Sequence, residues 1–325
     1  MKHTIKSIIA ATALAVLATQ SGAQTVLRFG HPAPDTDLSQ EMIEQFAAAV
    51  EKGTEGSVTI KIFPNGQLGT DSQMIDGVRS GILDFTLSGL NNFTGMLPEA
   101  GAFSLPFMFP DREIAYKVLD GDIGQSVLAD LEDFGMKGLG FAENGYRNIT
   151  NNRGPVRTPA DLAGLVMRVN NSQALGDMFQ ALDANPQQIA VAELYTALET
   201  GVVNAQDHPI WVVEAFKFFE VQKYLSLTQH AYSALTFVMN DDTFNGLTER
   251  EQEVIVSAAR EAIAFQRAAS QAAESEKVAF LESEGMIVNN DVDGAAFQEA
   301  AKPVWQSFID ENGDTLINAI LDASK

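Results

Sequence analysis

The most informative absence in this chain is cysteine, which does not occur among its 325 residues. Its absence excludes disulfides, a lipid-modified cysteine, and any metal site or nucleophile built on a thiolate. A chain of this length can fold without disulfides because large proteins bury most of their surface. For an exported chain, the lack of cysteine favours a bacterial periplasm over an animal secretory route.

Positive charge is also scarce, with 21 Lys and Arg against 43 Asp and Glu and a formal net charge of -22. Such a surface repels nucleic acid and anionic lipid head groups, so we expect neither as a partner. It repels anionic ligands at long range as well, so a site for an acid would need a local cluster of donors. The alternative is that the acidity only keeps an abundant exported protein soluble.

Catalytic motifs are missing too. The chain has no Gly-x-Ser-x-Gly, no Gly-rich phosphate loop ending in Lys-Ser/Thr, and no His-Glu-x-x-His. His31, His208 and His230 lack a partner at metal-ligand spacing. Asp207 and His208 would point to opposite faces of an extended segment, which weakens their interpretation as an acid–base dyad. We therefore expect no metal, no cofactor and no enzymatic activity.

The N-terminal 23 residues have the pattern of a removable signal peptide. Lys2 and Lys6 are basic, residues 8–17 are apolar, and Ser21-Gly22-Ala23 forms a small-residue cleavage site. The apolar run is too short to span a bilayer comfortably, and no later segment offers a span-length run. We expect a mature chain that begins near Gln24 and resides in the periplasm without a stable membrane anchor.

The remaining sequence interleaves alternating and helical patterns, which predicts an α/β fold. The patterns predict strands over residues 25–29, 58–62, 82–88, 136–142, 146–150 and 165–169. They predict helices over residues 38–50, 71–80, 114–134, 171–182, 192–200, 248–285 and 293–324. Asn185-Pro186 is expected to form a turn, and the helix from Thr248 has as its alternative two helices broken near Ser270.

One internal repeat bears on the site. Residues 74–84 and 194–204 both read as a short helix, a glycine cap and the start of a strand. The repeat favours two similar lobes that face each other, although any αβ unit could produce it. Ligands of open α/β sheets bind beyond the carboxyl ends of strands, which would place Asn91, Asn92, Gln206 and His208 near one cleft.

Two arginines, Arg147 and Arg168, are expected at the ends of short strands. A guanidinium is costly to bury unless an anion meets it, and its planar fork matches a carboxylate with two parallel hydrogen bonds. They are therefore candidates for a carboxylate site. The alternative for each is a structural salt bridge, for Arg168 with a residue such as Asp161.

Other polar side chains are expected at strand ends, where they could bind the hydroxyl groups of a ligand. These candidates are Asn91, Asn92, Asn144, Asn170 and Asn171. Each has the alternative role of a turn residue. Trp211 could stack on a ring, with core packing as its alternative.

Several short motifs, in order along the whole mature chain, resemble the DctP-type solute-binding proteins of TRAP transporters. The motifs are Leu27-Arg28-Phe29-Gly30-His31, Gln67-Leu68-Gly69-Thr70-Asp71, Leu105-Pro106-Phe107, Gly145-Tyr146-Arg147-Asn148-Ile149-Thr150, Pro159-Ala160-Asp161-Leu162-Ala163-Gly164-Leu165, Met167-Arg168-Val169, Glu193-Leu194-Tyr195-Thr196-Ala197-Leu198 and Glu220-Val221-Gln222-Lys223-Tyr224.

The resemblance implies a two-lobed periplasmic binding protein fold with a cleft between lobes, crossing hinge strands and a long bracing helix. The first lobe would comprise residues 24–145 and about 234–275, and the second residues 146–233 and about 276–325. Closure on one small organic acid would be followed by delivery to the permease subunits of a TRAP transporter.

The resemblance also implies roles for individual residues. Arg168 would be the main carboxylate partner and Arg147 a second contact, with Asn170 or Asn171 as the amide that follows. From the other lobe, the ligand would be reached by Asp71, His31, Asn91 and Asn92. His208 replaces an asparagine that many relatives carry, so it could donate one hydrogen bond or, when protonated, add charge.

The many amide side chains favour a sugar acid, of uronate or aldonate type, over a C4-dicarboxylate, which is the first alternative. A rival from another class is an exported sugar-acid enzyme that uses Asp207 and His208 as acid and base. A third is a receptor lobe that signals to a membrane partner.

Overall fold

The strands form one mixed sheet of nine strands, in the order β2-β1-β3-β8-β4-β7-β5-β6 with β9 paired to β8. The computed structural model describes residues 24–324, so the predicted signal peptide lies outside the described part. The strands are β1 (Thr25–Gly30), β2 (Val58–Phe63), β3 (Phe85–Gly89), β4 (Met136–Asn151), β5 (Val166–Val169), β6 (Asn185–Gln188), β7 (Ala205–His208), β8 (Tyr224–Asn240) and β9 (Ile287–Asn289). With the helices below, they confirm the predicted α/β class.

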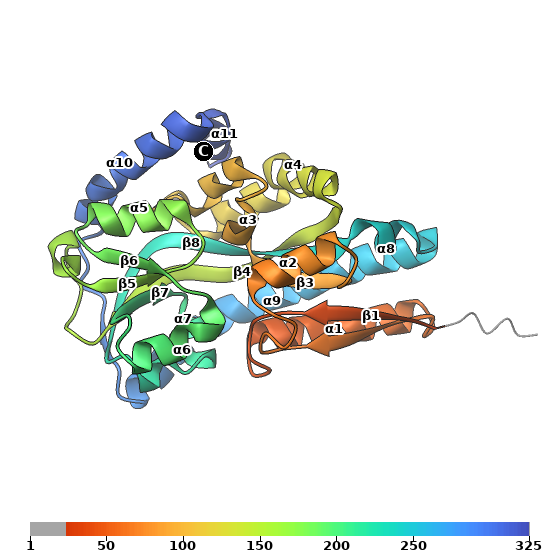
Figure 1. The fold of residues 1–325 in the computed structure, drawn as a ribbon, viewed down its shortest axis with the longest axis horizontal. Coiled ribbons are helices and arrows are strands. Elements are labelled where there is room, and N and C mark those ends of the chain that lie inside the picture. Colours follow the sequence, from red (N-terminus) through yellow and green to blue (C-terminus); the bar gives the residue numbers. More distant parts are fainter. Residues whose placement is uncertain (1–23, 325) are drawn as a thin grey trace, which may run out of the picture.

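Helices pack around the sheet (Figure 1). The α-helices are α1 (Leu38–Gly53), α2 (Asp71–Arg79), α3 (Arg112–Asp120), α4 (Asp122–Asp130), α5 (Gln173–Ala181), α6 (Val191–Glu199), α7 (Ile210–Ala215), α8 (Asp241–Asn245), α9 (Glu249–Ser283), α10 (Gly294–Asn312) and α11 (Thr315–Ala323). Short 3₁₀ helices are η1 (Leu90–Phe93), η2 (Pro98–Ser104), η3 (Leu131–Phe134), η4 (Pro159–Leu162) and η5 (Phe218–Glu220). Within residues 24–324, no helix is both long and apolar enough to cross a bilayer.

Two long antiparallel strands, β4 and β8, run across the middle of the sheet and join its two ends (Figure 1). β1–β3 lie on one side of this pair and β5–β7 on the other. The prediction of two separate strands over 136–142 and 146–150 was wrong. Gly140 (φ 148°) and Gly145 (φ 109°) lie at register shifts, and their conformations bend β4 without ending it. The residue boundaries of the two lobes stay a prediction.

The internal repeat corresponds to two matching units on opposite sides of the crossing strands. In the first, Asp84 Oδ2 accepts a hydrogen bond from the backbone N–H of Arg28 at 2.7 Å. In the second, Asn204 Oδ1 accepts one from the backbone N–H of Val166 at 3.0 Å. Each unit turns at a left-handed glycine, Gly81 at φ 72° or Gly201 at φ 74°, as expected for a helix that ends in a C′ glycine.

Three other predictions of element type or extent were wrong. Asn185-Pro186 begins strand β6 instead of forming a turn, because β6 is the edge of the sheet, where proline loses no ladder hydrogen bond. The helical pattern over 114–134 divides at Gly121 into α3 and α4 and closes with η3. The tail over 293–324 divides at Gly313, which adopts φ 79° between α10 and α11.

Helix α9 is continuous over 35 residues, so the alternative of a break near Ser270 is excluded. Its start is fixed by a capping box in which Thr248 and Glu251 bond each other's backbone N–H groups. It packs on α1 and β4, on α7, and on β9, so it contacts elements from both sides of the crossing strands. This arrangement matches the bracing helix that the family resemblance implies.

The core under β1 and β3 is built around buried phenylalanine rings. Phe237 lies with its ring centroid 5.2 Å from that of Phe29 and 4.9 Å from that of Phe46. All three side chains are fully buried, together with Phe85. Phe237 comes from β8, so this cluster attaches a crossing strand to the N-terminal helix and strands.

We expect Phe237→Ala to lower the free energy of unfolding by about 3–5 kcal/mol, because it removes a ring from a packed core and leaves a cavity. Val202→Ala, at a side chain that is 62% exposed, should change it little. Urea unfolding of both variants measures this, and equal effects would contradict the packing role of Phe237.

Candidate functional site

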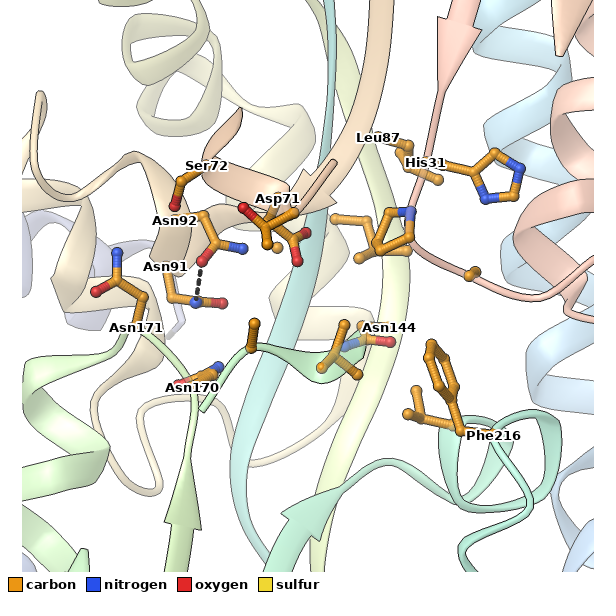
Figure 2. A pocket seen from close by; sticks show the side chains of 18 of the residues that line it. His31, Asp71, Ser72, Leu87, Asn91, Asn92, Asn144, Asn170, Asn171 and Phe216 are labelled. Carbon is orange, nitrogen blue, oxygen red and sulfur yellow. Dashed lines mark hydrogen bonds between the residues drawn. The ribbon is translucent and has the colours of Figure 1, made fainter. Parts of the chain in front are cut away.

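Most of the candidate residues line one cleft, which lies between the part of the sheet that holds β1–β3 and the part that holds β5–β7 (Figure 2). Its empty volume is about 970 Å³, which includes the open mouth. Candidates that line it are His31, Asp71, Asn91, Asn92, Asn144, Arg147, Arg168, Asn170 and Asn171. Figure 2 shows Asp71, Asn91 and Asn92 on one side of the cavity and Asn170 and Asn171 on the other. The cleft is thus built by segments that are far apart in sequence.

Arg168, the third residue of β5, is 2% exposed and has no carboxylate partner within residues 24–324. Its Nε donates to the carbonyl of Ile189 at 2.9 Å, and its Nη1 lies 3.2 Å from His208 Nε2. Nη2 forms no hydrogen bond with the described residues. The structural alternative, a bridge to Asp161, is not formed, because that carboxylate accepts from the backbone of Arg157 and Thr158. Arg168 therefore presents a free charge to the cleft.

Burial, and then the neighbouring charge of Arg147, lower the pKa of Arg168 to about 10, while Asp207 and Asp71 oppose both effects. The guanidinium still carries its charge at neutral pH. A buried cation without an anion is unfavourable. Such an arrangement is expected where a bound anion completes the pair.

Arg168 is the first donor in a chain of hydrogen bonds that all run in the same direction. Since arginine only donates, His208 Nε2 must accept, and the neutral ring then donates through Nδ1 to Gln206 Oε1 at 2.5 Å. Gln206 Nε2 donates to Thr150 Oγ1 at 2.7 Å, which donates to Gln222 Oε1 at 3.0 Å. These hydrogen bonds orient the guanidinium from the side that faces away from the cleft. Thr150 and Gln222 were not singled out in the sequence.

His208 and Gln206 therefore lie behind Arg168 and do not line the cleft. Burial, and then the charges of Arg168 and Arg147, hold the pKa of His208 well below its usual range, so the ring is neutral at neutral pH. Trp211 also lies outside the cleft: its ring covers Lys277 Nζ at 4.5 Å and its Nε1 donates to Ser270. The tertiary structure thus separates these three candidates from the cleft lining.

Arg147 lies inside strand β4, not at a strand end, and forms a buried ion pair with Asp207. Nε and Nη2 donate to the two carboxylate oxygens at 2.6 and 3.0 Å. Burial alone would raise the pKa of Asp207, but Arg147 and His230 hold it well below its usual range. The structural alternative for Arg147 is therefore present, although its side chain also lines the cleft.

On the opposite side, a second directed chain ends at Asp71, the first residue of α2. Asn91 Nδ2 donates to Asn92 Oδ1 at 3.2 Å, and Asn92 Nδ2 donates to Ser88 Oγ at 3.0 Å. Ser88 then donates to Asp71 Oδ1 at 2.5 Å. Ser88 was not identified from the sequence. The offset between the two repeat units, 74–84 and 194–204, aligns Ser88 with His208 and could have indicated it. Burial raises the pKa of Asp71, while Ser88 and Arg168 oppose that rise.

The remaining amides are each held by one hydrogen bond. Asn144 Nδ2 donates to Ser233 Oγ at 3.2 Å, Asn171 Oδ1 accepts from Gln188 at 2.7 Å, and Asn170 Oδ1 accepts from the backbone N–H of Ser172 at 3.1 Å. Each amide keeps a donor or an acceptor for a ligand.

His31 is anchored on helix α1. Its Nε2 lies 2.8 Å from Gln40 Oε1, and its buried Nδ1 has no partner among the described residues. Burial lowers its pKa, so the ring is neutral at neutral pH. In the described part of the chain, no three His, Cys, Asp or Glu side chains cluster as metal ligands. The cleft is thus suited to hydrogen bonding and charge pairing with an organic acid.

Comparison with known proteins assigns the family. The model of the bacterial extracellular solute-binding proteins of family 7, DctP, matches residues 29–312. The chain belongs to this family. The resemblance to TRAP-transporter solute-binding proteins is confirmed, and the family and similar solved structures are binding proteins.

The 2,3-diketo-L-gulonate-binding periplasmic protein YiaO of Escherichia coli K12 is 43% identical over 287 residues, which is 88% of each chain. The sugar acid binding protein DctPAm of Advenella mimigardefordensis, solved with galactonate, is 33% identical with a TM-score of 0.90, over 93% of this DctP-family chain and 98% of that one. A TRAP periplasmic solute-binding protein of Polaromonas, bound to D-erythronate, is 34% identical with a TM-score of 0.89, over 91% of this chain and 98% of that one.

The burial of His208 predicts a pH dependence of stability. Its folded-state pKa is depressed, so the unfolded chain takes up the proton first as pH falls below about 6.5. The wild-type chain should lose stability relative to His208→Gln below that pH, by up to about 1.4 kcal/mol per pH unit. Denaturant unfolding between pH 7.5 and 5 measures the difference. Parallel curves for the two proteins would show that this ring titrates normally.

The ion pair of Arg147 yields a second prediction. Asp207→Asn leaves a buried guanidinium without its carboxylate and should destabilise the fold by about 3–5 kcal/mol. The double variant Arg147→Met with Asp207→Leu removes both charges and should recover much of that loss. Unfolding free energies of the two variants test the pairing, and a loss below about 1 kcal/mol in Asp207→Asn would contradict it.

Proposed function

We propose that the protein captures a hydroxylated monocarboxylic acid of the sugar-acid type and delivers it to the membrane permease of a TRAP transporter. It would act in the periplasm, after export through the signal peptide at residues 1–23. The observation that carries the ligand class is the buried, unpaired guanidinium of Arg168 in a cleft rich in amides. The relatives named above bind diketogulonate, galactonate and erythronate, which are all hydroxylated acids with one carboxylate.

The ligand carboxylate would accept from the free Nη2 of Arg168, assisted by Arg147 at the same cleft wall. Asp71, Asn91 and Asn92 would meet the hydroxyl groups from the other side. Each charge-assisted hydrogen bond contributes roughly 1.5–3 kcal/mol, so a few are enough for micromolar affinity. The lobes, with the residue boundaries predicted above, would close by a hinge motion because these contacts form together only in the shut state.

The arrangement of Asp207 and His208 argues against the rival enzyme. Asp207 is bound by Arg147 and His230, and both ring nitrogens of His208 are hydrogen-bonded. Neither residue lines the cleft. A substrate in the cleft would therefore meet neither an acid nor a base from this pair.

We expect Arg168→Ala to lower the affinity for galactonate at least about a hundredfold, since it removes the charged donors. Arg168→Lys should fail similarly, because a compact ammonium loses the planar fork that directs separate donors to Ile189, His208 and a carboxylate. Arg157→Ala, which removes an exposed arginine paired with Asp291, is the matched control. Titration calorimetry measures all three, and near-native affinity in either Arg168 variant would disprove the clamp.

A further inference from the structure

The two walls of the cleft present opposite hydrogen-bonding character. The chain that begins at Arg168 runs donor to acceptor away from the cleft, so its cleft end, the guanidinium, offers only N–H donors. The chain through Asn92 and Ser88 runs toward the cleft and ends on the carboxylate of Asp71, which only accepts. A ligand that reaches both ends must therefore offer an acceptor to Arg168 and a donor to Asp71.

The charges follow the same division. Arg147 is already neutralised by Asp207, so Arg168 is the cation that remains for a ligand. Asp71 forms no ion pair with Arg168 within 4 Å, yet each shifts the pKa of the other. The other carboxylate lining the cleft, Asp37, is used to cap α1 through the backbone N–H of Ser39. Arg168 and Asp71 therefore place a positive and a negative charge on opposite walls of the ligand space.

The helices that start at the cleft strengthen this polarity. Helix α2 begins at Asp71, and its N-terminus is closed by a capping box between Thr70 and Gln73. Helix α6, its counterpart in the internal repeat, begins at Val191 with no side-chain cap, and its N-cap Ala190 and first residue Val191 line the same cleft as Arg168. Free N–H groups at a helix start favour an anion. The carboxylate is thus favoured at the Arg168 wall and disfavoured at the Asp71 wall.

We propose that Asp71 is a specificity residue, which accepts hydrogen bonds from the terminal hydroxyl groups of a monocarboxylic sugar acid and repels a second carboxylate at that position. The site then rejects dicarboxylates, including the C4-dicarboxylates kept above as an alternative. The proposal rests on the proposed function, because it takes Arg168 as the partner of the first carboxylate.

The sharpest test uses two ligands that differ only at the end facing Asp71. Galactonate ends in a hydroxymethyl group, and galactarate has a carboxylate in its place. The wild-type protein should bind galactonate at least tenfold more tightly than galactarate. Asp71→Asn keeps the shape, supplies an N–H donor and removes the charge, so it should weaken galactonate, strengthen galactarate, and change the affinity ratio at least a hundredfold.

Asp76→Asn is the matched control, because it removes one carboxylate from the exposed face of the same helix, where Asp76 pairs with Arg79. It should leave the ratio unchanged. Asp71→Ser should shift the ratio of the galactonate and galactarate affinities in the same direction as Asp71→Asn. If one of the two variants fails to fold, the other still tests the role of Asp71.

The outcomes separate this inference from the function it rests on. An unchanged ratio in both Asp71 variants, with loss of galactonate binding in Arg168→Ala, overturns the role of Asp71 and leaves the Arg168 clamp standing. Tighter binding of galactarate than galactonate by the wild-type protein overturns both the ligand class and the role of Asp71.

Discussion

A buried guanidinium held only by neutral groups is the constraint on which the site depends. Arg168 is fixed by a backbone carbonyl and by the unprotonated nitrogen of His208, so its position is set without cancelling its charge. If a carboxylate of the protein held Arg168 instead, that carboxylate would neutralise its charge before any ligand bound, as Asp207 does at Arg147. In the proposed function, a strongly acidic chain still binds an acid at Arg168, because short-range charge pairing in a buried cleft outweighs a screened surface field.

Strand β7 explains how two neighbouring arginines come to differ. Successive residues of a strand face opposite ways, so Asp207 and His208 reach different partners. Asp207 pairs with Arg147 on β4, while His208 supports Arg168 on β5. One short strand thus makes one cation structural and leaves the other available for ligand.

The matching units around residues 74–84 and 194–204 give the cleft its two walls, and each unit carries one directed hydrogen-bond chain. Ser88 orients Asp71 in the first, and His208 orients Arg168 in the second. The long strands β4 and β8 connect the units and supply side chains between them. A repeated scaffold with opposite polarity at its two ends is suited to a ligand that has unlike ends.

The sequence by itself determined the α/β class, most helices and strands, the family, and the cleft residues that lie at strand or helix ends, such as Asp71, Asn91, Asn170 and Arg168. The class, the elements, Asn91, Asn170 and Arg168 follow from local periodicity, capping and turn chemistry, which act over a few residues, whereas the family and the role of Asp71 come from the resemblance of short motifs. It did not determine that β4 continues through its glycines, or that Asn185-Pro186 joins the sheet edge, because pairing with distant strands overrides local preference. Only the tertiary structure decided which arginine is already neutralised and moved Gln206, His208 and Trp211 out of the cleft lining. The packing of the chain determines which residues, separated by tens of positions, become hydrogen-bond partners. A pattern that spans only a few residues cannot predict those partners.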